Sequence, residues 1–381
     1  MGIEMDSLDL LVYFVLFLYF PGLYLFYYLK EISEYPSLHY QSNPWNDVWI
    51  PSLARLHRVY RPFFFAYNRH LMIFAYLWKE RFSRRIAFQE EILQMKDGGT
   101  VGLSWYGLEN AEAFPETPIV VVLHTITGDA EDLRLTVSRI RERLNATVVV
   151  CIRRGHGNLP LTKPSINTMG STLDLQEQIK HIRNKFPKAP LLGLGISAGS
   201  GLLARYLGES GKKCAFSAAM AISPAYDIEK AFPRVHPTYS RLMALRLRQY
   251  FLKRHETILK DKYGFGILDS AKTIHEFQDN LYHIADHPDR NSYYRDHNPI
   301  HVIGEVDVPL LILNAEDDPV CVKENVEENL HWFDRLPKTI LVKLKRGSHI
   351  AFLEGLSAKS WSDELICDYF ERMLELFDER F

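Results

Sequence analysis

The residues that decide the fold are Leu-Leu-Gly-Leu-Gly-Ile-Ser-Ala-Gly-Ser-Gly-Leu-Leu-Ala-Arg-Tyr-Leu, at positions 191–207. Within them, the apolar run 191–194 precedes Gly195-Ile196-Ser197-Ala198-Gly199, and the helix-like run 201–207 follows. A Gly-x-Ser-x-Gly segment between a strand and a helix places its serine on a sharp turn, with the hydroxyl clear of the backbone. The two glycines let neighbouring elements approach without a Cβ clash. This context predicts that Ser197 is a nucleophile.

A serine hydroxyl is a poor nucleophile near neutral pH and needs a base within hydrogen-bond reach. Of the 15 histidines in the chain, only His349 lies in a Gly-flanked loop after the last predicted strand, residues 338–344. Catalytic groups of open α/β sheets gather at the carboxyl ends of strands, so this loop can meet Ser197 although it is distant in sequence. We therefore predict that His349 is the base.

A carboxylate must hold that histidine in the useful tautomer. The predicted strand 308–314 runs directly into the acidic residues Glu316, Asp317 and Asp318. Asp318 is favoured over Asp317, because the apolar Val320 would pack beneath the loop while the carboxylate of Asp318 points at the imidazole. Glu316 and Asp317 are expected to cap the turn and to be solvated.

Two backbone N–H groups must also face the oxyanion that develops during acyl transfer. The amide of Ala198 is expected to supply one of them. The other donor comes from the loop after the third strand in sites of this kind, and here the predicted strand 118–123 leads into the loop 124–129. We assign the second donor to Ile126, with Thr125 as the next choice.

Further motifs occur in one order along the chain, and they are Asp97-Gly98-Gly99 with Trp105, Arg154-Gly155-His156-Gly157, Leu173-Asp174-Leu175, Gly195 to Gly199, Tyr206 to Gly211, Tyr293 to Asp296, Asn314-Ala315 with Asp317-Asp318-Pro319, and Gly347-Ser348-His349 with Phe352 to Gly355. With these motifs the chain resembles the membrane-anchored α/β-hydrolase-domain lipases. That family is related to yeast and bacterial medium-chain esterases and to plant embryogenesis-associated proteins. The resemblance covers nearly the whole chain beyond its first segment.

The resemblance implies an α/β-hydrolase fold, in which helices flank a mostly parallel sheet and a helical insertion forms a cap. The family's triad positions match Ser197, Asp318 and His349. The implied activity is that of a serine hydrolase cleaving carboxylic esters of lipids, as an acylglycerol lipase, a phospholipase or a medium-chain esterase. The expected partner is a lipid ester substrate, and no metal or organic cofactor is implied.

Some positions depart from the family pattern. Thr125 stands where the family usually has glycine, Ser104 replaces an acidic residue, and Ser200 replaces a glycine after the elbow. The change at Thr125 matters most, because a β-branched residue restricts the backbone that must aim an N–H group at the oxyanion. A catalytically weak lipid- or steroid-binding protein is therefore one alternative function.

A lipid acyltransferase is the other alternative. In that reaction an alcohol or a lysolipid would outcompete water at the acyl-enzyme. His124 and Asp129 form a His-x-x-x-x-Asp string of the kind that suggests acyl transfer, but the spacing is short and common.

The N-terminus is the second strong feature of the sequence. No charged residue occurs from Leu10 to Leu29, and about 20 apolar residues are needed to cross a bilayer core. We predict a transmembrane helix there, kinked or bent at Pro21-Gly22. The chain would then be a single-pass protein of the endoplasmic reticulum or another endomembrane. Acidic residues before the helix and basic residues after it favour a cytosolic catalytic domain.

The chain divides into a membrane anchor at 1–30, a membrane-proximal segment at 31–90 and a hydrolase domain at 91–381. Residues 51–85 mix Lys and Arg with aromatic residues, a pattern that suits the headgroup level of a lipid surface. A helix packed on the hydrolase core with a solvated basic face fits the same residues equally well. An insertion at about 226–303 is the expected cap, whose apolar walls would hold an acyl chain.

Composition narrows the remaining classes. With 381 residues, 47% of them hydrophobic, the chain can bury one large core. Its formal net charge of −2 gives no support for nucleic-acid binding. The four cysteines show neither Cys-x-x-Cys pairing nor metal-ligand spacing with histidine, so no metal site is predicted. The sequence leaves the oligomeric state open.

Overall fold

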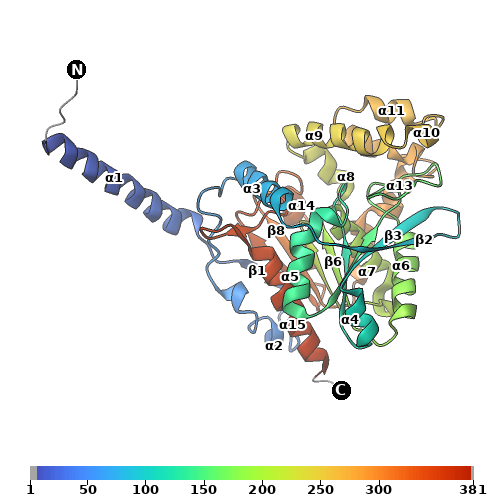
Figure 1. Cartoon of the computed structure of the whole chain (residues 1–381), viewed down its shortest axis with the longest axis horizontal. Helices are drawn as coiled ribbons and strands as arrows, with labels where there is room; N and C mark the ends of the chain where they lie inside the picture. Colours follow the sequence, from blue (N-terminus) through green and yellow to red (C-terminus); the bar gives the residue numbers. More distant parts are fainter. Residues whose placement is uncertain (1–6, 379–381) are drawn as a thin grey trace.

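The computed structural model describes residues 7–378 of the chain. Its centre is a nine-stranded sheet with the order β1-β9-β8-β7-β6-β4-β5-β3-β2 (Figure 1). The strands from β9 to β5 run parallel, whereas β1, β3 and β2 are antiparallel to their neighbours. The bounds are β1 (Ser37–Tyr40), β2 (Gln89–Gln94), β3 (Thr100–Tyr106), β4 (Ile119–Leu123), β5 (Thr147–Ile152), β6 (Leu191–Ile196), β7 (Ala218–Ile222), β8 (Leu310–Ala315) and β9 (Thr339–Leu344).

The central strands are apolar along their whole length because both faces of the sheet are covered. Every residue of β4, β5, β6 and β8 is buried. Continuous apolar runs of this kind are typical of parallel strands between two helical layers. The strands predicted at 118–123, 191–194, 308–314 and 338–344 are confirmed as β4, β6, β8 and β9.

Helices cover the two faces of the sheet. On one face, α5 (Arg134–Leu144) and α15 (Trp361–Asp378) pack against alternate strand residues that include Val120 and Val122. On the other face, α6 (Thr172–Lys185) and α7 (Ala198–Ser210) pack against the residues in between, such as Val121. Two short helices, α4 (Leu108–Ala113) and α14 (Lys323–Glu327), complete this second layer. A small ribbon of β10 (Leu353–Glu354) and β11 (Lys359–Ser360) precedes α15.

The predicted cap insertion at 226–303 is a group of short helices gathered at one end of the sheet (Figure 1). They are α8 (Ile228–Ala231), α9 (Pro237–Leu247), α10 (Glu256–Leu259), α11 (Phe265–Ser270), α12 (Ile274–Asp279) and α13 (Arg290–His297). These helices share a hydrophobic core that includes Phe251, Phe277 and Tyr293. The same core reaches Ala198, so the cap lies against the first residue of α7.

Residues 37–60, which the sequence analysis placed in a membrane-proximal segment, are part of the hydrolase fold. Strand β1 pairs with β9 at the edge of the main sheet. After α2 (Asn46–Trp49), the side chains of Trp49, Ile50 and Tyr60 join the core under α15. Helix α3 (Arg69–Phe82) follows, with its N-terminus capped by the Asn68 side chain. The segment is tied to the domain because it fills apolar surface that the later strands leave open.

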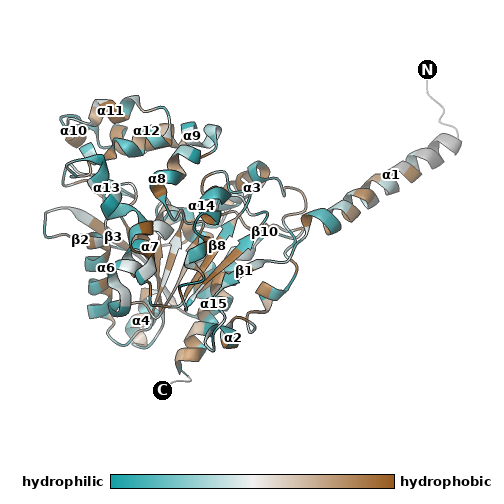
Figure 2. Ribbon diagram, turned by 180° about the vertical axis from the view of Figure 1, so that it is seen from behind, coloured by the Kyte–Doolittle hydropathy of each residue, from teal (hydrophilic) through white to brown (hydrophobic). Residues whose placement is uncertain are grey.

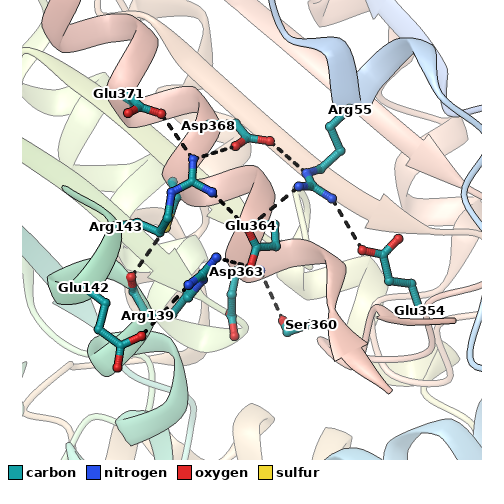
Figure 3. Close-up of polar contacts among 11 residues, drawn as sticks. Arg55, Arg139, Glu142, Arg143, Glu354, Ser360, Asp363, Glu364, Asp368 and Glu371 are labelled. Atoms are coloured by element: carbon teal, nitrogen blue, oxygen red, sulfur yellow. Dashed lines mark hydrogen bonds and ion pairs between the residues drawn. The ribbon is translucent and has the colours of Figure 1, made fainter. Parts of the chain in front are cut away.

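An ion-pair network also fastens this segment to α5 and α15 (Figure 3). The Arg55 Nε lies 2.8 Å from an Asp368 oxygen. Arg139 and Arg143, on α5, approach Glu364 to 2.6 Å and 3.1 Å, and Arg143 also meets Asp368 at 3.3 Å. Carboxylates shared among several guanidinium groups hold geometry better than an isolated surface pair does. The network therefore joins three elements that are far apart in sequence.

The apolar N-terminal run forms α1 (Ser7–Tyr27), which extends away from the body of the protein (Figures 1 and 2). The last turn of α1 and the π-helical turn that follows contact residues 62–64 of the same chain. Tyr24 donates a hydrogen bond of 2.6 Å to the Phe64 carbonyl, and Tyr28 donates one to the Pro62 carbonyl. No helix formed by residues 7–378 combines the length and the apolar character that a membrane crossing needs. The transmembrane helix predicted at 10–29 is therefore not supported, and the end of that run contacts protein. Residues 1–6 of the predicted anchor lie outside the described residues.

Glu80 lies on the buried side of α3 with an exposed fraction of 6%. Neither of its carboxylate oxygens has a hydrogen-bond partner within the described chain. Burial, reinforced by the nearby carboxylate of Asp363, raises the pKa of Glu80 to about 8. A carboxyl whose folded-state pKa exceeds its unfolded-state pKa destabilises the fold progressively as the pH rises through the folded-state value.

Glu80→Gln should stabilise the protein more at high pH than at low pH, because the amide stays neutral where the carboxyl ionises. In wild type, the free energy of unfolding is not reduced by Glu80 below about pH 4.5. It falls as the pH rises from there and has lost the whole contribution once the pH passes about 8. We expect the difference in unfolding free energy, variant minus wild type, to grow by about 3 kcal/mol between roughly pH 5 and pH 9. Urea unfolding at both pH values measures it. A difference that does not change with pH would contradict the burial of an unpaired carboxyl.

Candidate active site

Ser197 lies on the turn between β6 and α7 with φ of 55° and ψ of −120°, a strained conformation for a residue with a side chain. The flanking positions must be glycine, because neighbouring backbone atoms leave no space for a Cβ. A Cβ on Gly195 would lie 2.5 Å from the Ser200 Cα, and one on Gly199 would lie 2.1 Å from the Leu123 carbonyl oxygen. The predicted nucleophile elbow is therefore present, and the close packing of α7 against β4 and β6 explains its glycines.

The structure brings together Ser197, His349 and Asp318, the residues predicted from three separate loops. The Ser197 Oγ lies 2.7 Å from the His349 Nε2. The His349 Nδ1 lies 2.9 Å and 3.1 Å from the two carboxylate oxygens of Asp318. His349 and Asp318 are exposed by only 7% and 2%. Serine, imidazole and carboxylate thus form one chain of hydrogen bonds, of which the imidazole and the carboxylate are buried.

Asp318 is oriented by its own loop. One carboxylate oxygen accepts hydrogen bonds from the backbone N–H groups of Val320 (2.7 Å) and Cys321 (2.8 Å). These bonds leave the carboxylate facing the imidazole. Val320 also lines the cavity beside Ser197 and packs against the core of the cap.

Asp317, the competing acid, has a different task. Its Oδ1 accepts hydrogen bonds from the N–H groups of Gly347 (2.9 Å) and Ser348 (2.8 Å), directly before His349. Burial raises the pKa of Asp317 to about 6. Asp317 therefore caps the loop that carries the histidine, and Glu316 pairs at 3.2 Å with Lys343.

The loop that carries His349 needs one more support, which the sequence analysis missed. Ser348 and Ile350, on either side of the histidine, have φ values of 51° and 58°. The Ile350 N–H donates a 3.2 Å hydrogen bond to the Ser223 Oγ. Ser223 follows β7 and itself has φ of 50°. A serine after a buried strand gives no sequence signal that separates it from an ordinary turn residue.

The two predicted oxyanion donors are the backbone amides of Ala198 and Ile126. The Ala198 N–H is the first of α7 and has no acceptor within the helix. Neither it nor the Ile126 N–H donates a hydrogen bond to any residue of the described chain. Both Ala198 and Ile126 line the cavity at Ser197, whereas Thr125 does not. The Thr125 hydroxyl instead lies beside Gly128, where a Cβ would be 2.5 Å from it. The β-branched side chain is accommodated outside the cavity.

The cavity at Ser197 is small, about 40 Å³, and almost wholly apolar. Its walls come from the cap, from the loop before α6 and from the loop of Asp318, and they include Met169, Ala225, Ile228, Phe232, Met243 and Val320. Methionine side chains are flexible and fill irregular space. Walls of this kind suit the apolar carbons of an acyl group next to the ester carbonyl, and a longer chain would need the methionine side chains to move.

Ligand atoms of Asp318, Cys321 and His349 lie within 4.8 Å of one another. The Asp318 and His349 atoms are already engaged in the hydrogen-bond chain to Ser197. Burial raises the pKa of the Cys321 thiol well above its ordinary value. The donor set suits proton transfer and does not fit a metal centre.

His124, which suggested acyl transfer in the sequence, is 1% exposed and serves the backbone. Its Nε2 lies 3.4 Å from the Arg153 N–H, and its Nδ1 lies 2.9 Å from the Thr125 carbonyl oxygen. The ring is thus enclosed beneath the oxyanion loop and does not line the cavity at Ser197.

The sheet order, the elbow and the cap are those of an α/β-hydrolase. Residues 118–356 match the model of the alpha/beta hydrolase fold family, and the chain belongs to that family. The individual proteins that the chain resembles have low sequence identity to it. The embryogenesis-associated protein EMB8 of Picea glauca is 28% identical over 84% of this chain and 74% of its own length. The human phospholipase ABHD3 is 24% identical over 94% and 90%, and the monoacylglycerol lipase of Saccharomyces cerevisiae is 24% identical over 69% and 60%.

Asp318→Asn and Asp317→Asn should separate the roles of the two acids. The first change leaves the imidazole without the carboxylate that sets its tautomer, and we expect kcat for ester hydrolysis to fall by about 10³- to 10⁴-fold. The second keeps an oxygen that accepts both loop N–H groups, and we expect less than about a tenfold loss. Steady-state kinetics on a soluble ester measure both. Equal losses in the two variants would show that the acid has been wrongly assigned.

Proposed function

We propose that the protein is a serine hydrolase that cleaves carboxylic esters of lipids. The observation that carries the proposal is the hydrogen-bond chain from the Ser197 Oγ through His349 to Asp318, with distances of 2.7 Å and 2.9 Å. Nucleophile, base and orienting acid stand within reach of one another, which is the arrangement that activates a serine hydroxyl. The apolar cavity beside Ser197 suits the first carbons of the acyl group.

In the proposed mechanism, His349 takes the proton of Ser197 as the hydroxyl attacks the ester carbonyl, and Asp318 stabilises the imidazolium. The N–H groups of Ala198 and Ile126 bind the oxyanion, and one such donor is worth roughly 3 kcal/mol. His349 then protonates the leaving alcohol. Water attacks the acyl-enzyme with the same base assisting, which releases the acid and restores Ser197.

The apolar cavity walls and the relatives support a lipid ester as the substrate class. Two of the relatives are named a phospholipase and a monoacylglycerol lipase. An apolar acyl group suits walls of methionine, phenylalanine and aliphatic side chains, which also keep water from the oxyanion. Acylglycerols, phospholipids and medium-chain esters share that acyl ester group.

Labelling with a fluorophosphonate probe tests the proposal. Wild type should form a covalent adduct because Ser197 is activated, and Ser197→Ala should form none. Ser200→Ala is the matched control, since Ser200 is a buried serine on the next turn whose hydroxyl bonds to the Ser197 carbonyl. It should label like wild type. A wild-type protein that does not label would favour the alternative of a catalytically silent lipid-binding protein.

We also propose that the protein meets its substrate at a lipid surface through α3. Phe74, Trp78 and Phe82 follow one another at helical spacing on the outer side of this helix and are exposed by 60%, 58% and 67%. Their rings form a stripe, with centroids 6.0 Å and 4.5 Å apart. Soluble proteins rarely present such a stripe to water, and it suits the interfacial region of a bilayer.

Charge supports an anionic lipid surface. Arg81, Arg84 and Arg85 are exposed beside the stripe, and none of them pairs with a carboxylate in the described part of the chain. A groove of about 1130 Å³ runs from the stripe inward to Thr125 and Ile350, the neighbours of the oxyanion donor and of His349. A lipid ester could therefore pass from the surface to the site along α3.

A triple variant, Phe74→Ser, Trp78→Ser and Phe82→Ser, should separate surface binding from chemistry. We expect hydrolysis of a soluble short-chain ester to stay within about twofold of wild type, because the stripe does not touch Ser197. Hydrolysis of a lipid ester in phosphatidylcholine vesicles containing phosphatidylserine should fall at least about tenfold. Leu173→Ser, an exposed apolar residue of α6, is the control and should change neither rate. Equal vesicle activity in the triple variant and wild type would contradict the surface role of α3.

A further inference from the structure

Arg153 is a buried cation with no carboxylate partner among residues 7–378. It follows β5 directly and is 6% exposed. No Asp or Glu of the described chain lies within ion-pair distance of it, and its Nε and Nη1 have no hydrogen-bond partner there. Burial lowers the pKa of its guanidinium to about 9. Its neighbour Arg154, by contrast, makes hydrogen bonds of 2.6–3.0 Å to Asp97 and Asp174.

The engaged nitrogen of Arg153 reaches the oxyanion loop. Its Nη2 donates to the carbonyl oxygen of Thr125. The same oxygen accepts from the Gly128 N–H at 3.3 Å and lies 2.9 Å from the His124 Nδ1. The Arg153 Nη2 also lies 3.1 Å from the His124 Nδ1, and the Arg153 N–H lies 3.4 Å from the His124 Nε2. Two donors, the Arg153 Nη2 and the Gly128 N–H, thus converge on one carbonyl oxygen, and the His124 ring lies beside them.

Fixing that carbonyl fixes the amide on the other side of the same peptide bond. In a trans peptide the C=O and the N–H point in opposite directions. The Thr125 carbonyl points down to Arg153, so the N–H of Ile126 points away from Arg153, toward the cavity that Ile126 shares with Ser197. The next carbonyl, that of Ile126, lies 3.0 Å from the His156 Nε2 and is held on the same side.

The placement of Arg153 is costly for stability and needs a reason. A buried charge without a counter-ion destabilises a fold, and an apolar side chain of similar volume is often as stable or more so. The chain even makes room for it: Gly170, at φ of 89°, would place a Cβ 2.7 Å from the Arg153 Cδ. Because the Arg153 Nη2 donates its hydrogen bond to the oxyanion loop, we look to that loop for the role of the buried arginine.

We propose that Arg153 is a positioning residue that holds the oxyanion loop through the Thr125 carbonyl and so aims the Ile126 N–H at Ser197. The role rests on the proposed hydrolase function. It also explains how a threonine is tolerated at position 125: the carbonyl is fixed by external donors, so the loop does not depend on glycine to adopt its conformation. Arg153 touches neither the substrate nor the reacting atoms.

The test compares Arg153→Met with Arg154→Met in the full chain, by hydrolysis of p-nitrophenyl butyrate and by thermal unfolding. Methionine keeps the volume of arginine and removes the donors. For Arg153→Met we expect kcat to fall on the order of 100-fold with KM within about twofold, because the missing interaction acts on the transition state. Its Tm should stay near that of wild type. Arg154→Met should show the reverse: kcat near wild type and a clearly lower Tm, since it leaves Asp174 without its cation and Asp97 with Lys163 alone.

A third variant, Arg153→Lys, retains a cation and one donor and should recover part of the lost kcat. Unchanged kcat in a folded Arg153→Met protein would overturn the positioning role, and so would a variant that fails to fold, since the arginine would then be structural. A wild-type protein without esterase activity would instead refute the proposed function, and the positioning role would fall with it.

Discussion

The fold depends on the strained turn at Ser197. Its φ of 55° is allowed only because β6 and α7 are held tightly on both sides, with no room for a Cβ at Gly195 or Gly199. That turn carries the hydroxyl out of the backbone to within 2.7 Å of His349. Parallel strands then gather the other groups, because β8 and β9 end at the same edge of the sheet as β6. The packing of the sheet and its helices thus offsets the backbone strain at Ser197.

The loops around that turn are fixed by backbone hydrogen bonds from buried side chains. Asp317 holds the loop before His349, Ser223 holds the loop after it, and Arg153 with His124 holds the oxyanion loop. None of these side chains reacts in the proposed mechanism. They keep the reacting groups in place, because a misplacement of about 1 Å can slow an enzyme by roughly 100-fold.

The sequence predicted the strands β4, β6, β8 and β9, the elbow, the cap and the meeting of Ser197, Asp318 and His349, since each has a local signal: an apolar run, a glycine pair or an acidic loop. It did not predict the pairing of β1 with β9, which joins residues about 300 positions apart and leaves no periodic trace. The apolar run at 10–29 was predicted to cross a membrane, yet its end contacts residues 62–64. Arg153 was missed because nothing local to residue 153 tells a buried arginine from an exposed one.

The most direct test of the account is to look for an acyl group on Ser197 during turnover. When p-nitrophenyl butyrate is mixed in excess with the enzyme and the reaction is quenched with acid, we predict a burst of nitrophenol approaching one per chain. Peptide mass mapping should then find a butyryl group on Ser197. The absence of a burst, together with an acyl group on another residue or on none, would contradict the claim that this serine is the nucleophile.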